Sequence, residues 1–330
     1  MGVKDPTTRE WLRALIEPAM ILKMAMYYYL ETNAKAVLSG RVLAPLLNAN
    51  ELRDEAFGRF WVAFSANREE QTPTTEESEQ APIQDASAAL SSQTAQSPED
   101  DLSPEIKEVQ MSSDLIPPIL AQASGVTLDV GPGTGTQMSL LAKNRDVSAI
   151  YGAEPCAGLH AELKRRAELN GLGGKYTILP CGVEKTQLAK EMQNAGLIEQ
   201  NGKGTELFDT IVTIRVLCSV PHLQGTVSHL YDLLKPGGKL LVVEHVVNPW
   251  MSPKGSILAR VMQGLYHALG WRWVMGDCCL NRDTEGVLRA VGKEKEKDGN
   301  GNGGWESVSV ERWFERTCMV YVAGVFVKKA

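Results

Sequence analysis

TLDVGPGTGTQ, residues 127–137, places three closely spaced glycines directly after a short apolar run. An apolar run, a glycine turn and then a helical pattern predict a strand, a tight loop and a helix. Gly131, Gly133 and Gly135 form G-x-G-x-G, whereas the dinucleotide fingerprint G-x-G-x-x-G needs its third glycine at position 136, which is threonine. No G-x-x-x-x-G-K-[ST] run follows the strand either. The spacing therefore disfavours a nicotinamide dinucleotide and a nucleoside triphosphate as ligands.

Strands and helices alternate from residue 104 onward. Five apolar runs, each followed by a further segment that is helical or polar, are VTLDVG (126–131), SAIYGAE (148–154), KYTILP (175–180), FDTIVTIRVL (208–217) and GGKLLVVEHV (237–246). Such units predict parallel strands, because parallel neighbours need a crossover connection. WESVSVERW (305–313) and CMVYVAGVFVKK (318–329) have little between them and indicate an antiparallel edge hairpin. We expect an α/β, doubly wound, Rossmann-like sheet of seven mostly parallel strands with an antiparallel edge strand.

Two segments precede this domain. Residues 1–65 are predicted to be helical and to cap the core, since Leu52, Phe57, Phe60, Trp61 and Phe64 share one helix face. Residues 66–103 are rich in Glu, Gln, Ser, Thr, Ala and Pro, which predicts a disordered linker. The domain that binds a ligand is predicted to span residues 104–330.

Composition excludes several classes of protein. The formal net charge of −6 gives no electrostatic basis for binding nucleic acid. The six cysteines lack zinc-finger spacing and the density of a disulfide scaffold, so we expect reduced thiols. Cys278 and Cys279 have no further cysteine or histidine at ligand spacing and are interpreted as packing residues, so no metal ligands are predicted.

The N-terminus has no secretory signal pattern, which favours a cytoplasmic location. Pro18 and Lys23 interrupt the apolar run of residues 15–30, which is too short to span a bilayer. We expect an amphipathic helix packed on the domain, with peripheral membrane contact as the alternative.

Two acidic residues specify the ligand of the glycine loop. Ligands of doubly wound sheets bind at the carboxyl ends of the strands. Asp129, two positions before the first glycine, presents a carboxylate to a cationic group, and Glu154, at the end of the second strand, is placed to accept both hydroxyls of a ribose. A ligand with a ribose and a positive end fits S-adenosylmethionine.

LDVGPGTG, FDTIVTIRVLCSV and LLKPGGKLLVVEHV, in this order, resemble class I S-adenosylmethionine-dependent methyltransferases over about residues 105–330. VLCSV, VVEHV and GDCCLNRDT also resemble the animal methyltransferase-like thiol methyltransferases and their fungal relatives. The resemblance implies a cofactor site in four parts. Asp129, Gly131, Gly133 and Gly135 would lie beside the methionine part, and Glu154 at the ribose. Cys181, Gly182 and Val183 would lie beside the adenine, and Ile214 and Arg215 would close the pocket.

The methyl acceptor is expected to be a small, fairly apolar molecule, because an N/D-P-P-Y/F/W run for base amino groups is missing. Methyl transfer is an in-line displacement that depends mainly on alignment, and a thiol is partly ionised near neutral pH. A thiol is therefore favoured over oxygen or nitrogen acceptors of specialised metabolism. His245 is either a general base or a buried structural histidine.

A catalytically silent module that binds the cofactor or a partner protein is the alternative function, suggested by Arg215, a large cation for its place, and by the altered adenine corner PCGVE. A set of aromatic residues, with the N-terminal helices, is expected either to roof the pocket or to pack in the core: Trp250, Tyr266, Trp271 and Trp273.

Overall fold

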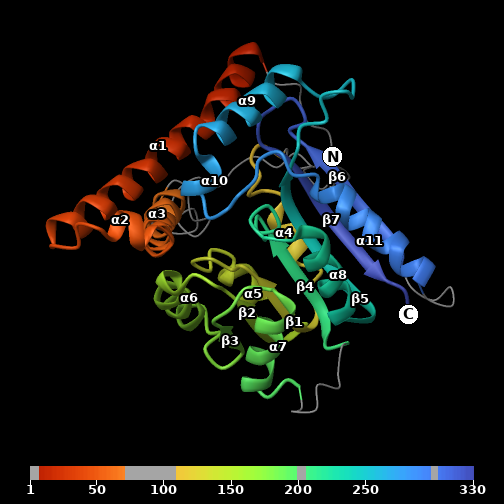
Figure 1. Cartoon of the computed structure of the whole chain (residues 1–330). Coiled ribbons are helices and arrows are strands. Elements are labelled where there is room, and N and C mark those ends of the chain that lie inside the picture. The colour runs from red at the N-terminus through yellow and green to blue at the C-terminus, as the bar shows by residue number, and fades with distance from the viewer. Residues whose placement is uncertain (1–6, 71–108, 199–205, 299–303) are drawn as a thin grey trace, which may run out of the picture.

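The computed structural model describes residues 7–70, 109–198, 206–298 and 304–330. Seven strands form one sheet in the order β3-β2-β1-β4-β5-β7-β6 (Figure 1). The strands are β1 (Gly125–Val130), β2 (Val147–Ala153), β3 (Tyr176–Leu179), β4 (Phe208–Ile214), β5 (Leu234–Val246), β6 (Trp305–Trp313) and β7 (Val320–Lys328). The predicted doubly wound, mostly parallel sheet is confirmed.

The strand order reverses at β1, which lies between β2 and β4. β1 pairs in parallel with both, so that Asp129 lies opposite Gly152 of β2 and Val212 of β4. β7 runs antiparallel between β5 and β6. The carboxyl ends of β1, β2 and β4 therefore meet at one edge, where a ligand crevice opens in such sheets.

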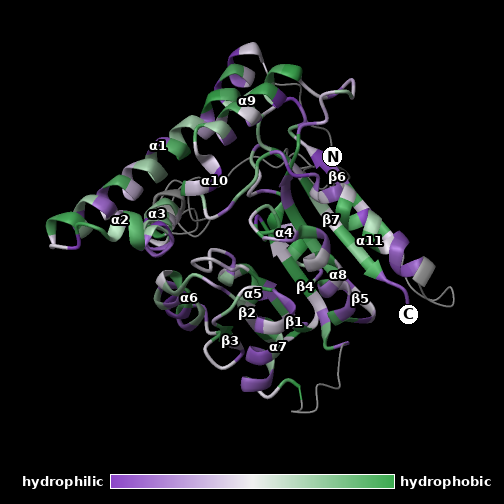
Figure 2. Cartoon of the chain, viewed as in Figure 1, coloured by the Kyte–Doolittle hydropathy of each residue, from purple (hydrophilic) through white to green (hydrophobic). Residues whose placement is uncertain are grey.

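Helices cover both faces of the sheet, because its central strands are apolar on both sides. On β5, Leu240 and Val242 face one hydrophobic core while Leu241 and Val243 face the other. Figure 2 shows β7 as hydrophobic along most of its length. One face is covered by α4 (Ile116–Leu120), α5 (Met138–Lys143) and α6 (Ala157–Leu169), the other by α7 (Lys185–Asn194), α8 (Leu223–Leu233) and α11 (Thr284–Asp298).

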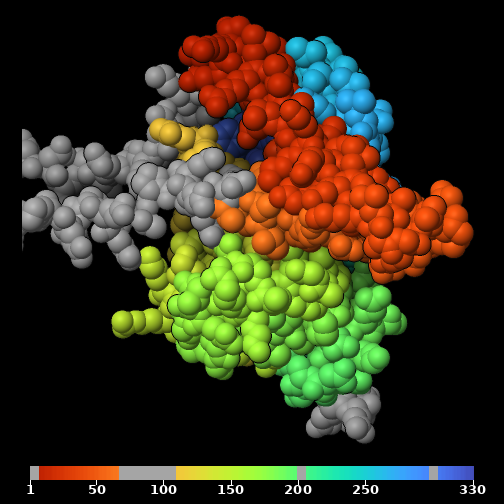
Figure 3. All heavy atoms as spheres, turned by 90° about the vertical axis from the view of Figure 1, so that its left-hand side faces the viewer, coloured from red at the N-terminus to blue at the C-terminus, as the bar shows by residue number. Residues whose placement is uncertain are grey.

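A further helical layer lies over the carboxyl ends of the strands. It consists of α1 (Thr8–Leu38), α2 (Ala44–Leu47), α3 (Ala49–Glu70), α9 (Ile257–Ala268) and α10 (Trp271–Val274). Phe60 of α3 and Trp271 of α10 are almost completely buried in the core of this layer, together with Leu15 of α1. Figure 3 shows the N-terminal helices in close contact with the α/β part. The N-terminal segment thus belongs to the same packed structure as the sheet.

Helix α1 begins with a capping box. The Thr7 hydroxyl accepts a hydrogen bond from Glu10 N (3.3 Å), and the Glu10 carboxylate accepts one from Thr7 N (2.8 Å). No helix of the described residues is long and apolar enough to cross a membrane.

Two helices extend beyond their expected ends. Helix α3 continues to Glu70, so the first residues of the predicted linker 66–103 are helical, whereas residues 71–103 lie outside the described residues. Helix α11 continues to Asp298 through Glu294 and Glu296, although the charges and glycines of EKEKDGNGNGG (294–304) predict a loop there. Composition placed both boundaries too early, because Ala, Glu, Lys and Arg also favour helix.

Candidate functional site

The loop after β1 has a backbone conformation that glycine adopts most easily. Gly131 and Gly133 have φ values of +58° and +61°, and a Cβ on Gly131 would overlap the side chain of Val216. The Gly131 N–H donates to Ala153 O at 2.9 Å, which ties the loop to the end of β2. The main chain of the loop therefore forms part of the wall of the crevice.

Glu154 follows β2 directly and joins the two strand ends. Its buried carboxylate accepts from Gly133 N through Oε2 (2.9 Å) and from Cys156 N through Oε1 (2.8 Å). Burial raises the pKa of Glu154, although both N–H donors oppose this change. An ionised carboxylate has about four acceptor positions, so about two remain for further donors such as sugar hydroxyls.

Asp129 of β1 is buried beside Glu154. Its Oδ2 accepts from the Tyr176 hydroxyl at 3.0 Å. Burial raises the pKa of Asp129 to about 7; the Tyr176 hydrogen bond lowers it, and the charge of Glu154 raises it further. A cationic ligand group placed here would favour the ionised form of Asp129.

A cavity of about 410 Å³ opens between the sheet edge and the helical layer. The predicted site residues that line it are Asp129, Gly131, Gly133, Gly135, Glu154, Gly182, Val183, Ile214, Arg215 and His245. The predicted adenine contact Cys181 is not among the lining residues. Its side chain is buried in the hydrophobic core that also contains Leu188 of α7. The chain turns after Cys181, so that Gly182 and Val183 reach the cavity instead.

Arg215 adopts a left-handed conformation with φ of +57° at the end of β4. Its Nη2 donates to Ser112 Oγ at 2.8 Å, and its guanidinium lies 5.7 Å from the centre of the Tyr321 ring. These contacts hold the large cation in the cavity wall.

His245 of β5 lines the cavity, whereas the adjacent Glu244 does not. Glu244 Oε1 accepts from Val216 N and Leu217 N, both at 3.0 Å, and so fixes the turn after β4. His245 Nε2 lies 3.1 Å from Cys278 Sγ, and its Nδ1 has no hydrogen-bond partner among the described residues.

Cys218, His245 and Cys278 lie together at the cavity wall. One ligand atom from each lies within 4.8 Å of the other two, and all three residues are buried. The sequence predicts no metal ligands and a packing role for Cys278, because no partner occurs at ligand spacing along the chain. Such spacing does not detect a cluster assembled from β5 and two separate loops.

Aromatic residues of the N-terminal helices cover the cavity. Phe57, Trp61 and Phe64 of α3 line it, with Phe57 and Trp61 stacked at 5.8 Å between ring centres. Of the four aromatic residues proposed as a roof, Trp271 lines the cavity. The other three do not: Trp250 and Trp273 are partly exposed, and Tyr266 is buried against Leu15 O.

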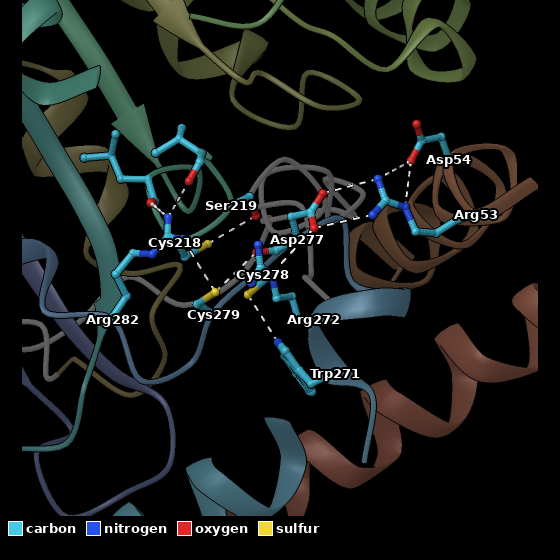
Figure 4. A network of polar contacts seen from close by, with 12 residues as sticks. Arg53, Asp54, Cys218, Ser219, Trp271, Arg272, Asp277, Cys278, Cys279 and Arg282 are labelled. Carbon is cyan, nitrogen blue, oxygen red and sulfur yellow. Dashed lines mark hydrogen bonds and ion pairs between the residues drawn. The ribbon is translucent and has the colours of Figure 1, made fainter. Parts of the chain in front are cut away.

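An ion pair at the cavity wall was not predicted. Arg53 of α3 lies 3.2 Å from Asp277, which follows α10, and Arg272 lies 3.6 Å from the same carboxylate (Figure 4). Arg53 and Asp277 are 224 positions apart, so no local pattern reveals the pair. It links the N-terminal helices to the loop that carries Cys278.

These residues fit an adenosyl sulfonium ligand. Gly133 and Gly182 have no side chains, so a ligand can lie directly against their backbone. Asp129 and Glu154 contribute carboxylates with remaining acceptor positions, and Val183 offers an apolar surface to a base.

A family model for a methyltransferase domain matches residues 107–275, just over half of the chain. The chain belongs to this methyltransferase domain family. A comparison with curated proteins gave no match.

Solved structures with a similar fold include methyltransferases. An O-methyltransferase family protein from Burkholderia thailandensis is 13% identical, with 64% of this chain and 52% of that chain covered and a TM-score of 0.42. This chain therefore spans about half of that protein. A geranyl diphosphate C-methyltransferase from Streptomyces coelicolor A3(2), solved with S-adenosyl-L-homocysteine, is 13% identical, with 66% and 74% covered and a TM-score of 0.44.

The raised pKa of Asp129 predicts a pH dependence of stability in the ligand-free protein. Between pH 5 and 7 the folded state holds a proton on Asp129 that the unfolded state has released, so this residue makes the free energy of unfolding fall as pH rises. Asp129→Asn should remove up to about 1.4 kcal/mol per pH unit from that slope in urea unfolding.

The matched control is Asp209→Asn, since the hydrogen bond and charge of Lys235 contribute to lowering the pKa of Asp209 despite the opposing effect of burial. This variant should lose stability throughout the range and leave the slope unchanged. Equal slopes for Asp129→Asn and the wild type would show that Asp129 is ionised in the folded state.

Proposed function

We propose that the chain is an S-adenosylmethionine-dependent methyltransferase that acts on the thiol of a small, fairly apolar acceptor, as in the thiol methyltransferase group that its motifs resemble. The observation that supports this proposal most strongly is the set of residues that line the cavity beyond the glycine loop. The aromatic rings of Trp61, Phe64 and Trp271 line it together with Cys218, His245 and Cys278. Such a surface suits an apolar molecule and a soft sulfur atom better than a charged or sugar-like acceptor.

The residues of the chain divide between cofactor and acceptor. We assign Asp129 and Gly131, Gly133 and Gly135 to the methionine part, Glu154 to the ribose hydroxyls, Gly182 and Val183 to the adenine, and Ile214 and Arg215 to the closure of the pocket. When bound, S-adenosylmethionine supplies a methyl group whose bond to sulfur breaks as the acceptor's electron pair forms the new bond. The remaining task of the protein is to align the acceptor and exclude water.

His245 is proposed as the catalytic residue, because it lies in β5 at the cavity wall and is only 4% exposed. Its role is to help the acceptor lose a proton before transfer. A thiol, with a reference pKa of about 8.5, needs less help than an alcohol or a protonated amine.

The N-terminal segment, residues 1–65, is proposed as a cap that shapes the acceptor end, with residues 104–330 as the cofactor-binding domain. Trp61 approaches the glycine loop, and Ser65 Oγ accepts a hydrogen bond from Thr134 Oγ1 at 3.0 Å. The cap therefore contacts the loop itself.

Glu154→Gln should weaken binding of S-adenosylhomocysteine by about 10- to 100-fold in isothermal titration, since hydrogen bonds to a charged group contribute about 1.5–3 kcal/mol. Glu168→Gln, on the exposed side of α6, should bind like the wild type. Equal affinities for wild type and Glu154→Gln would remove the ribose assignment.

The acceptor class is tested with radiolabelled cofactor and matched aromatic thiols, phenols and anilines. We expect the radiolabelled methyl group to be transferred to the thiols faster than to the phenols or anilines. Exclusive methylation of phenols or anilines contradicts the thiol assignment, and no product from any class favours a silent cofactor-binding module.

We further propose peripheral membrane contact through α1 and α9, which pack side by side (Figure 1). Both helices expose large apolar side chains, among them Ile16 and Met20 of α1 and Ile257 and Val261 of α9, each more than half exposed. An exposed apolar surface of this kind suits a lipid interface.

The wild type should therefore float with phosphatidylcholine vesicles and be released by carbonate. Met20→Glu combined with Val261→Glu should reduce flotation at least about fivefold, because two charges would enter the interface. Leu169→Glu, an exposed position on α6, is the control. No flotation of the wild type, or unchanged flotation of the double variant, contradicts the proposal.

A further inference from the structure

Three soft or borderline ligand atoms converge at the acceptor end of the cavity. Cys218 lies in the turn after β4, His245 in β5 and Cys278 in the loop after α10, and their ligand atoms all lie within 4.8 Å of one another. His245 Nε2 and Cys278 Sγ are 3.1 Å apart. The three residues are 2%, 4% and 7% exposed, so bulk water does not solvate these atoms well.

This donor set is the kind that zinc selects. Zinc prefers cysteine sulfur and histidine nitrogen, with bonds of about 2.3 Å and 2.0–2.1 Å. Tetrahedral geometry then places the ligand atoms about 3.5–3.8 Å apart. The distance from His245 Nε2 to Cys278 Sγ is shorter than this range, and no distance within the cluster exceeds 4.8 Å, so shifts of about 1 Å or less would complete the site.

Surrounding groups already orient two of the ligands. The Trp271 indole N–H donates to Cys278 Sγ at 3.2 Å (Figure 4), a contact that stabilises negative charge on the sulfur. Glu244 holds the turn that carries Cys218 through two backbone N–H groups. Metal sites depend on such outer contacts as well as on the ligands themselves.

We propose that Cys218, His245 and Cys278 bind one zinc ion whose fourth coordination position opens into the cavity and takes the sulfur of the acceptor. Three protein ligands and one open position are typical of catalytic zinc, whereas structural sites have four protein ligands. The open position follows from the cavity, because all three residues line it. The role in catalysis rests on the thiol acceptor proposed above.

The chemistry of this site balances without another reactant. The acceptor thiol replaces a water molecule on zinc and releases its proton to solvent, because a coordinating thiol is deprotonated. The sulfur keeps an electron pair, which forms the bond to the methyl carbon, and the pair of the broken bond stays on the sulfur of the cofactor. The neutral thioether product is a weak ligand and leaves. In this site, His245 aids the loss of the proton of the acceptor thiol by acting as a ligand of the metal.

The test uses the full chain, prepared metal-free under reducing conditions and titrated with zinc against a chromophoric chelator. We expect one zinc per chain. Cys218→Ser and Cys278→Ser should each weaken zinc binding more than about 100-fold, because a thiolate ligand is lost. Cys279→Ser is the matched control, since the Cys279 thiol contacts Asp277 O and Arg282 and is not part of the cluster.

Titration of the same samples with S-adenosylhomocysteine separates this inference from the proposed function. Wild type and Cys278→Ser should bind it equally, which shows that both are folded. A wild type that binds S-adenosylhomocysteine but no stoichiometric zinc, or that forms a Cys218–Cys278 disulfide in place of the site, overturns the zinc site and leaves the proposed function intact. Zinc binding without methylation of any thiol overturns the acceptor and the catalytic role of the metal.

Cobalt substitution tests the open position. The cobalt protein should show thiolate charge-transfer absorption that is reduced in Cys278→Ser and retained in Cys279→Ser. Addition of an aromatic thiol should increase this absorption, whereas the matched phenol should not. A spectrum unchanged by the thiol would show a site that is closed to the acceptor.

Discussion

The hydrogen bonds of Glu154 are the constraint on which the site depends. One carboxylate joins the loop after β1, through Gly133, to the start of α6, through Cys156. It thereby fixes two strand ends of the sheet relative to each other at the point where the strand order reverses. Because the carboxylate is buried and still has acceptor positions, the same group that holds the loop can bind a sugar.

In the proposed assignment, the cofactor and acceptor ends of the cavity come from different parts of the chain. The α/β part provides the glycine loop and both carboxylates, whereas α3 and α10 provide most of the aromatic surface. Contacts between Thr134 and Ser65 and between Arg53 and Asp277 connect the two parts. If the N-terminal helices cap the acceptor as proposed, a change in them would alter acceptor selection while leaving the proposed cofactor residues in place, which is how one fold can serve many acceptors.

Sequence patterns predicted what depends on local order. Apolar runs and turns indicated the sheet, and parallel strands bring their carboxyl ends to one edge, so Asp129 and Glu154 were expected near each other. The Cys218, His245 and Cys278 cluster was not predictable in this way, because it depends on where two loops pack against β5. The same holds for Trp61 and Trp271, since a stripe of apolar residues does not show which of them will face a cavity.

The most direct test of the central claim is a crystal structure of the protein with S-adenosylhomocysteine. We predict that the ribose hydroxyls lie within hydrogen-bond distance of Glu154, the adenine beside Val183, and the amino acid part against the glycine loop and Asp129. A ligand bound elsewhere, or a Glu154 carboxylate turned away from the sugar, would contradict the account.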